Sequence, residues 1–369
     1  MSRVIRNATA WAVVSLLALS SAHAQNNKAL TVAQIVPLSG PLANVGKEIS
    51  QISEAVIAEH NRTAGAVRLN LKTLDDGNNA DQSAQLAQGV ANEAVALLSC
   101  FGTTGCLAQQ KVSEAWQLPL IGPIAGAATL RGPNAKHTFA VRASAAQEVQ
   151  RLLGFVSAMG LTRVGVAVQD DGFGRAYAAE LDKLQAGFPQ LQVKRLVFDP
   201  KGSDYQPLIQ GLRAGKPHAL ILLANASHST ALLNAWKAQD NLPFVLNLAG
   251  QANALFAGRM QGYTGTAAFV TVVPSPWESR TPLQRDYQRL AQEAKLPPSY
   301  LGFEAFINAR LLTQAVQKAQ ASNARDLHKH LEAQRNLDLG GYTVSYADRR
   351  LGSTFTDLSL LRKDGSFKH

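Results

Sequence analysis

Short apolar runs and amphipathic stretches alternate along almost the whole chain, and this alternation limits the possible folds more than any other feature. The pattern predicts a strand over Leu30–Val36, a helix over Gly46–Asn61 and a strand over Leu69–Leu74. The fully apolar run Ala94–Ser99 is typical of a strand that is buried on both faces. Repeated strand–helix alternation indicates parallel sheets that are covered by helices.

A second series of the same kind begins near Ser144 and predicts a second sheet. The segment Pro274–Trp277 interrupts this series and indicates a crossing back to the first part of the chain. The predicted later elements are strands at Arg163–Val168, Gln192–Val197, Ala219–Leu223, Ala268–Val273, Tyr342–Tyr346 and Asp357–Leu361, and helices at Pro282–Ala294, Tyr300–Gln320 and Ala324–Gln334.

The two series together predict an α/β fold with two doubly wound parallel-sheet lobes joined by a hinge of several crossings. The expected N-terminal lobe comprises residues 25–143 and 274–347, and the expected C-terminal lobe comprises residues 144–273 and 348–369. Open α/β sheets bind ligands at the carboxyl ends of their strands. A ligand site is therefore expected between the lobes.

Residues 1–24 have the three parts of a secretory signal peptide in the usual order. Arg3 and Arg6 precede the apolar run Ala10–Leu19, and Ala22-His23-Ala24 forms a small-residue cleavage box. The apolar run is shorter than the roughly 20 residues that span a bilayer. We expect export, cleavage after Ala24 and, since no lipid-attachment cysteine follows Ala24, a freely diffusing periplasmic protein.

The basic composition does not indicate a nucleic-acid partner. The formal net charge is +10, but the lysines and arginines are spread thinly and lack interleaved aromatic residues. A basic surface without one particular partner is the favoured interpretation.

No arrangement of residues typical of an enzyme is found. The nucleophile elbow, the phosphate loop and the zinc-binding H-E-x-x-H pair are all missing from the sequence. Asp75 and Asp76 could form a carboxylate pair, but their D-D-G-N context favours a turn in which the side chains bind their own backbone. We expect neither catalysis nor a cofactor nor a metal.

Cys100 and Cys106 are the only cysteines, and they flank a five-residue segment. An oxidising compartment permits a disulfide between them, and this is favoured slightly over free thiols. Metal ligation is the weaker alternative because no second pair of ligands lies nearby. The Cα separation, which decides the matter, does not follow from sequence.

Several segments together resemble the leucine/isoleucine/valine-binding group of periplasmic solute-binding proteins. Each is weak alone, but their order and spacing match the family through most of the chain. The matching segments are Leu30–Gly46, Leu74–Asn78, Thr103–Gly105, Gly122–Ala127, Val141–Ser144, Val166–Gly174, Asp204–Leu208 and Lys216–Ala219.

The resemblance implies a monomeric, non-enzymatic receptor that closes two lobes on a small solute and delivers it to an ATP-driven inner-membrane permease. It implies that Thr103, with Thr104 beside it, meets a ligand carboxylate. A threonine hydroxyl and its own backbone N–H can both donate to such a group. Helix capping is an alternative role for Thr103. It also implies that the backbone of Ile124 and Gly126 meets the ligand head group and that Phe173 forms an aromatic wall. The further implied pocket residues are Ser39, Asn44, Ser227, Glu304 and Phe306.

The chain departs from the pattern of the amino-acid binders at three positions. Those proteins have a hydroxyl where Gly126 stands, an acid near Ala249 and an aromatic residue near Ala226 or Ser227. An unpaired buried ammonium is costly, so the missing acid predicts either a replacement by Glu304 or a ligand without an ammonium. A sensory receptor with the same lobes is an alternative function, and an exported hydrolase is a weaker one.

Overall fold

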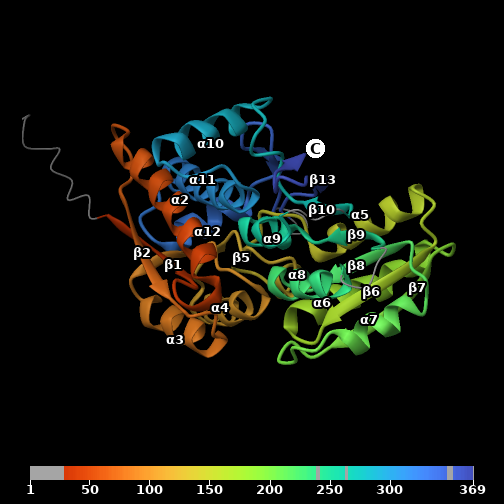
Figure 1. The fold of residues 1–369 in the computed structure, drawn as a ribbon. Coiled ribbons are helices and arrows are strands. Elements are labelled where there is room, and N and C mark those ends of the chain that lie inside the picture. The colour runs from red at the N-terminus through yellow and green to blue at the C-terminus, as the bar shows by residue number, and fades with distance from the viewer. Residues whose placement is uncertain (1–28, 238–241, 262–264, 347–351, 369) are drawn as a thin grey trace, which may run out of the picture.

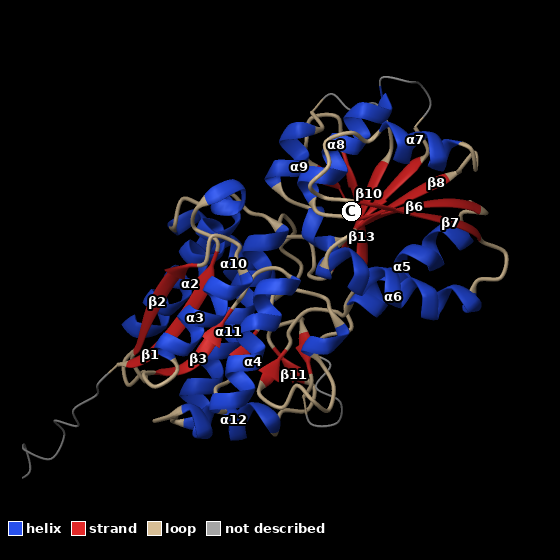
Figure 2. Cartoon of the chain, turned by 90° about the horizontal axis from the view of Figure 1, so that it is seen from below, coloured by secondary structure: helices blue, strands red, loops and turns tan. Residues whose placement is uncertain are grey.

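The computed structural model describes residues 29–237, 242–261, 265–346 and 352–368 of the 369-residue chain. The predicted signal peptide, residues 1–24, lies outside these ranges. Within them, the strands form two separate sheets and a two-stranded hairpin. Figure 1 and Figure 2 show the two sheets in two bodies, each with helices packed around its sheet. The predicted α/β class with two parallel-sheet lobes is confirmed.

The first sheet has the strand order β2-β1-β3-β4-β5, and all of its pairs are parallel. Its central strand is β3, all five residues of which are buried as the apolar run predicts. The elements are β1 (Leu30–Val36), α2 (Ala43–Arg62), β2 (Leu69–Asp75), α3 (Ala80–Val90), β3 (Ala94–Leu98), α4 (Thr103–Trp116), β4 (Leu120–Ile121) and β5 (Thr138–Phe139).

The second sheet has the order β14-β13-β10-β9-β8-β6-β7, in which β10 to β7 are parallel and β13 and β14 are antiparallel additions. Its strands are β6 (Arg163–Gln169), β7 (Gln192–Phe198), β8 (Ala219–Leu223), β9 (Phe244–Asn247), β10 (Ala267–Thr271), β13 (Asp357–Leu361) and β14 (Phe367–Lys368). Its helices are α5 (Ala145–Ala158), α6 (Gly172–Leu184), α7 (Gln206–Arg213), α8 (Ala226–Lys237) and α9 (Ala254–Arg259).

The chain passes between the two bodies after β5, after β10 and after β12. The second passage leads to α10 (Pro282–Glu293), α11 (Tyr300–Ala319), α12 (Ala324–Glu332) and the hairpin of β11 (Leu337–Asp338) with β12 (Thr343–Val344). Figure 1 shows α10 and α11 beside α2, in the body of the first sheet. The first two passages each end in a capping box, Ser144 with Gln147 and Thr281 with Gln284. These boxes satisfy the first amides of α5 and α10 and so define where each new body begins.

A glycine in the first turns of a helix lets that helix approach the end of a strand in each body. A Cβ on Gly46 in α2 would overlap the Pro37 carbonyl, and a Cβ on Gly174 in α6 would overlap the Gln169 carbonyl. Only glycine allows such an approach without displacing backbone. The two bodies therefore use the same packing device beside the cleft.

Some predicted elements are longer than the observed ones. Strand β5 is only two residues long, because the residues that follow Phe139 pass between the bodies. The strand expected over Tyr342–Tyr346 is reduced to Thr343–Val344 in the hairpin. The lobe boundaries stay predictions, and the boundary at residues 347–348 lies outside the described ranges. None of the helices in these ranges combines the length and apolar character needed to cross a bilayer.

Candidate functional site

The carboxyl ends of the strands of both sheets face a single cavity of about 520 Å³. The loops after β3 and β4 and the start of α11 line it from the first body, and the loops after β6, β8 and β9 line it from the second. Small-molecule sites have volumes of roughly 300–1,000 Å³. The cavity therefore has the size and the position expected of a ligand site between two lobes.

Thr103 and Thr104 occupy the first two positions of α4 and line this cavity. The Thr103 side chain is almost fully buried, and its Oγ1 has no hydrogen-bond partner among the described residues. Gly102 is the N-cap, so the alternative capping role for Thr103 is wrong. The first turn of this 14-residue helix contains no acid and has no side-chain cap. Its amides and its positive dipole end therefore favour an anionic ligand group.

Cys100 and Cys106 are joined by a disulfide, with 5.3 Å between their Cα atoms. Both side chains are fully buried. The bond encloses residues 101–105, and four of these five residues line the cavity. It thus links the end of β3 to the first turns of α4 directly beside Thr103.

Ile124 and Gly126 line the cavity, but their backbone groups are already partly used. The Ile124 N–H donates to the Cys100 carbonyl, and the Ile124 carbonyl accepts from the Gly102 N–H. The Gly126 carbonyl accepts from Ala145 at 2.7 Å. Ile124 therefore offers a ligand its side chain rather than its backbone N–H.

A buried cluster of charged residues joins the two bodies beside Gly126. Arg142, in the first passage, donates to Glu148 Oε1 of α5 at 2.6 Å and lies 3.6 Å from Glu304 Oε1 of α11. Tyr177 of α6 also donates to Glu148 Oε1, at 2.6 Å. The second Glu148 oxygen accepts from the Ala249 N–H. Arg142 thus holds one carboxylate from each body at the hinge.

The cluster alters the acid–base properties of its members. Burial raises the pKa of Glu304, although Arg142 partly offsets this effect. Burial alone would lower the pKa of Arg142, but the carboxylates of Glu304 and Glu148 outweigh it and raise that pKa. Burial and the nearby Arg142 lower the pKa of Arg131 to about 10. Arg131 donates to four backbone carbonyls around the first passage and so braces it.

Glu304 lines the cavity, and its Oε1, which lies 3.6 Å from Arg142, accepts no hydrogen bond from any described residue. It comes from the first turns of α11, whose Tyr300 and Leu301 add apolar surface to the same wall. An ammonium or another N–H donor of a ligand could pair with this carboxylate. Glu148 cannot take that role, because Arg142, Tyr177 and Ala249 already occupy its oxygens.

Phe173 and Ser227 line the cavity from the second body, at the starts of α6 and α8. Phe173 is half-buried and packs on Tyr177, with 5.0 Å between the ring centroids. Beside it, Asp171 caps α6 by accepting from the Gly174 N–H. A Cβ on Gly172 would lie 3.0 Å from the Thr104 methyl group, so α4 and α6 approach each other here across the cleft.

Three of the predicted site residues do not line the cavity. Ser39 borders a separate open hollow beside Asp75 and Asp76, and its N–H donates to Asp75. Asn44 is exposed on the first turn of α2. Phe306 is fully buried against Tyr287 and Phe303 in the core. Glu304 and Phe306 are two residues apart on α11, so a helix directs them to different faces.

Sequence reasoning missed three polar side chains of the cavity wall. They belong to a larger set of unpredicted polar residues on that wall and are Arg142, Tyr177 and Thr271, of which Thr271 Oγ1 has no hydrogen-bond partner within the described ranges. A buried arginine after an apolar strand, as in Val141-Arg142-Ala143, was the one available signal. Nothing local marks Tyr177, which lies among apolar residues on the buried face of α6.

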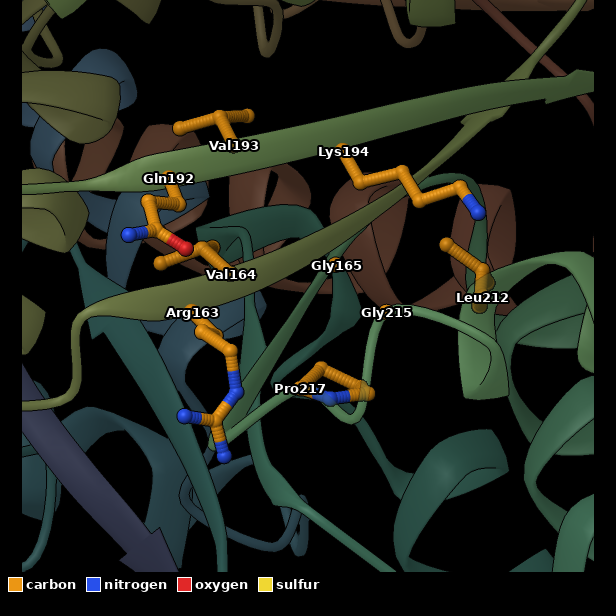
Figure 3. A pocket seen from close by; sticks show the side chains of 9 residues that line it. All are labelled: Arg163, Val164, Gly165, Gln192, Val193, Lys194, Leu212, Gly215 and Pro217. Carbon is orange, nitrogen blue, oxygen red and sulfur yellow. The ribbon is translucent and has the colours of Figure 1, made fainter.

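A third and smaller hollow lies at the opposite end of the second sheet. It has a volume of about 200 Å³ and lies at the starts of β6 and β7, lined in part by Arg163, Gln192 and Lys194 (Figure 3). Figure 3 shows the Lys194 side chain directed away from Arg163, so the two cations do not converge. Within the described ranges, no group of three or more His, Cys, Asp or Glu side chains could hold a metal ion.

Structures similar to this chain have the same two-lobed architecture. A possible leucine/isoleucine/valine-binding protein from Rhodopirellula baltica SH 1 aligns with a TM-score of 0.83 at 20% identity, covering 93% of this chain and 96% of that one. A branched-chain amino acid transporter substrate-binding protein from Streptococcus pneumoniae, solved with isoleucine, aligns with a TM-score of 0.80 at 13% identity. The alignment covers 93% of this chain and 98% of that one. A fatty acid ABC transporter substrate-binding protein from Thermomonospora curvata aligns with a TM-score of 0.81 at 16% identity. The alignment covers 92% of this chain and 91% of that one.

These similarities show the fold, and the family comes from a comparison of sequence patterns. The pattern of the family described as "periplasmic binding protein" matches residues 29–362, which is most of the chain. The chain therefore belongs to the periplasmic binding protein family and has its type I fold.

Proposed function

We propose that this protein is the substrate-binding component of an ABC importer and captures an amino acid, or a related small carboxylate with an apolar body, by closure of its lobes. The proposed lobes are residues 25–143 with 274–347 and residues 144–273 with 348–369. The proposed location is the periplasm, after cleavage behind Ala24. The protein would work as a monomer and pass its solute to an inner-membrane permease.

The observation that carries the proposal is the start of α4. Thr103 presents a hydroxyl that has no hydrogen-bond partner among the described residues, and it does so at an uncapped helix N-terminus. A buried polar group without a partner costs about 1–3 kcal/mol. A ligand carboxylate would satisfy both the hydroxyl and the helix amides, which makes this position a suitable anchor for an anion.

The rest of the cavity supports an apolar ligand body. Leu42, Val45 and Phe101 line it from the first body, and Phe173 and Leu255 line it from the second. Burial of apolar surface contributes about 25 cal/mol per Å². Contacts with both bodies would favour the closed arrangement over the open one.

A second candidate is a receptor for a solute without an ammonium, such as an aliphatic or aromatic carboxylate or an amide. It is favoured by the position of Ala249, where the amino-acid binders have an acid. The nearest carboxylate, Glu148, is already bound to the Ala249 N–H. The similar structures include both an isoleucine complex and a fatty acid transporter protein, so the fold accommodates either class.

A thermal-shift screen of the mature protein tests the proposal. Amino acids, organic acids and amides at millimolar concentration should include at least one compound that raises the melting temperature, since a ligand bound only by the folded state stabilises it. Matched probes then identify the head group: leucine, 4-methylpentanoate and 3-methylbutylamine have the same branched chain. If no compound in the screen stabilises the protein, the transport function is wrong.

A further inference from the structure

We propose that the Cys100–Cys106 disulfide positions the ligand-binding segment Phe101–Thr104, so that capture of a carboxylate depends on the oxidised bond. The part of this proposal that concerns the ligand rests on the proposed function. The part that concerns the segment does not, because it can be measured on the ligand-free protein.

The disulfide encloses one of the segments of the first body that line the cavity. Phe101, Gly102, Thr103 and Thr104 all lie on the cavity wall, and all four lie between the two bonded cysteines. The bond runs from the loop after β3 to the fourth residue of α4. It therefore fixes the angle at which the helix leaves the strand, and with it the position of the Thr103 hydroxyl.

Besides the disulfide, this segment is held by the packing of Phe101 against the apolar core and by backbone hydrogen bonds to the loop after β4. The Ile124 N–H donates to the Cys100 carbonyl, and the Gly102 N–H donates to the Ile124 carbonyl. Among the described residues, no side chain caps α4. Gly102 has a φ of +76°, and glycine adopts positive and negative φ values about equally readily. Without the disulfide, rotation at Gly102 would move the first turn of α4 away from its binding position.

The surrounding core does not depend on the bond. Cys100 and Cys106 pack in an apolar cluster with Ala33, Ile35 and Leu120. Two reduced thiols would keep that cluster filled, and two alanines would keep it apolar, whereas buried serine hydroxyls would lack partners there. Loss of the bond should therefore loosen the segment while β1, β3 and β4 stay paired.

Reduction by a dithiol such as dithiothreitol would release the segment. The S–S bond takes up two electrons and two protons to give two thiols, and the dithiol is oxidised to its own cyclic disulfide. Binding and oxidation state must influence each other by the same factor. A carboxylate that binds the oxidised form more tightly must make the bond harder to reduce by that factor.

The test uses the mature protein, the Cys100→Ala/Cys106→Ala variant and a matched control, Ser113→Ala. The Ser113 hydroxyl donates to Leu118 at the far end of the same helix, so its loss weakens α4 without touching the segment. Hydrogen exchange of residues 101–107 is measured without ligand. We expect about tenfold faster exchange in the double variant and in the reduced wild type, corresponding to one lost constraint. In Ser113→Ala the segment should keep the wild-type rate.

The ligand arm uses leucine and 3-methylbutylamine, which lacks the carboxylate. Leucine should bind the double variant about tenfold more weakly, as expected for one lost anchoring interaction, and any binding of 3-methylbutylamine should be unchanged. Unchanged exchange of the segment, or faster exchange with unchanged leucine affinity, overturns the proposal. If neither leucine nor any screened carboxylate binds the oxidised wild type, the proposed function fails, and the exchange measurement alone decides the positioning role.

Discussion

The two walls of the cavity use their polar groups differently. On the wall of the first body, Thr103 Oγ1 and Glu304 Oε1 accept or donate no hydrogen bond within the described ranges. On the wall of the second body, Tyr177 donates to Glu148 and the Gln169 amide donates to Asp171. Thr271, at the end of β10, is the exception on that side.

We infer from this difference that the two bodies have separate tasks. Buried polar groups normally have hydrogen-bond partners, so we expect the polar end of a solute to bind where atoms of the first body lack one. The satisfied network of the second body instead holds a fixed shape, against which the apolar end can pack. A solute would therefore bind the first body through its head group, and the second body would close over it.

The largest expected effect comes from breaking the network at the hinge. Arg142→Ala leaves Glu148 and Glu304 without their shared cation, which should lower the free energy of unfolding by about 3–5 kcal/mol. The control is Arg175→Ala, which removes an exposed partner of Asp170 and should cost less than about 1 kcal/mol. Urea denaturation measures both. Equal losses would mean that the buried network does not hold the two bodies together.

A smaller effect is expected at Gly126, where a side chain would meet the buried hinge network. A Cβ there would press on Tyr177 Oη, lie 3.0 Å from the Ala145 nitrogen and lie 3.1 Å from Glu148 Oε1. Gly126→Ala should therefore cost about 1–3 kcal/mol by overpacking. Adding Tyr177→Phe to Gly126→Ala removes Tyr177 Oη, the atom closest to the new Cβ, and should recover part of that loss. A double variant that shows only the sum of the two single losses would contradict this explanation.

The smallest expected effect is a change in how the free energy of unfolding depends on pH, and it is tested at Glu304. Because burial raises its pKa, the folded protein keeps this proton to a higher pH than the unfolded chain does. Stability from this group is thus lost as the pH rises above the ordinary value of about 4.3. Glu304→Gln should gain stability relative to the wild type between pH 4 and pH 7.

Asp338→Asn provides a control of opposite sign for that measurement. Backbone N–H groups of Gly341 and Gly340 lower the pKa of Asp338, so its contribution is present at neutral pH and lost on acidification. This variant should lose stability relative to the wild type as the pH rises. If the stabilities of both variants, relative to the wild type, change with pH in the same direction, burial does not raise the pKa of Glu304 in the folded protein.

Much of the architecture could be predicted because it is local. The apolar run at β3 and the alternation around β6 specify strands without reference to the rest of the chain. The position of Thr103 followed from a resemblance, since a threonine after a strand does not by itself indicate a binding site. The network around Arg142 could not be predicted, because Glu304 lies far away in the sequence and only the fold brings it close. For the same reason, nothing local showed that Tyr177 fills the space beside Gly126.

Titration calorimetry on Thr103→Val and Tyr177→Phe, with a carboxylate solute from the thermal-shift screen, tests the contrast between the two walls most directly. Thr103→Val should bind about tenfold more weakly and should be at least as stable as the wild type without ligand, because its buried hydroxyl has no hydrogen-bond partner within the described ranges. Tyr177→Phe should lose about 1–3 kcal/mol of stability, because Glu148 loses a donor, and should keep its affinity within about twofold. Weaker binding by Tyr177→Phe together with unchanged binding by Thr103→Val would contradict the assignment of the ligand head group to the first body.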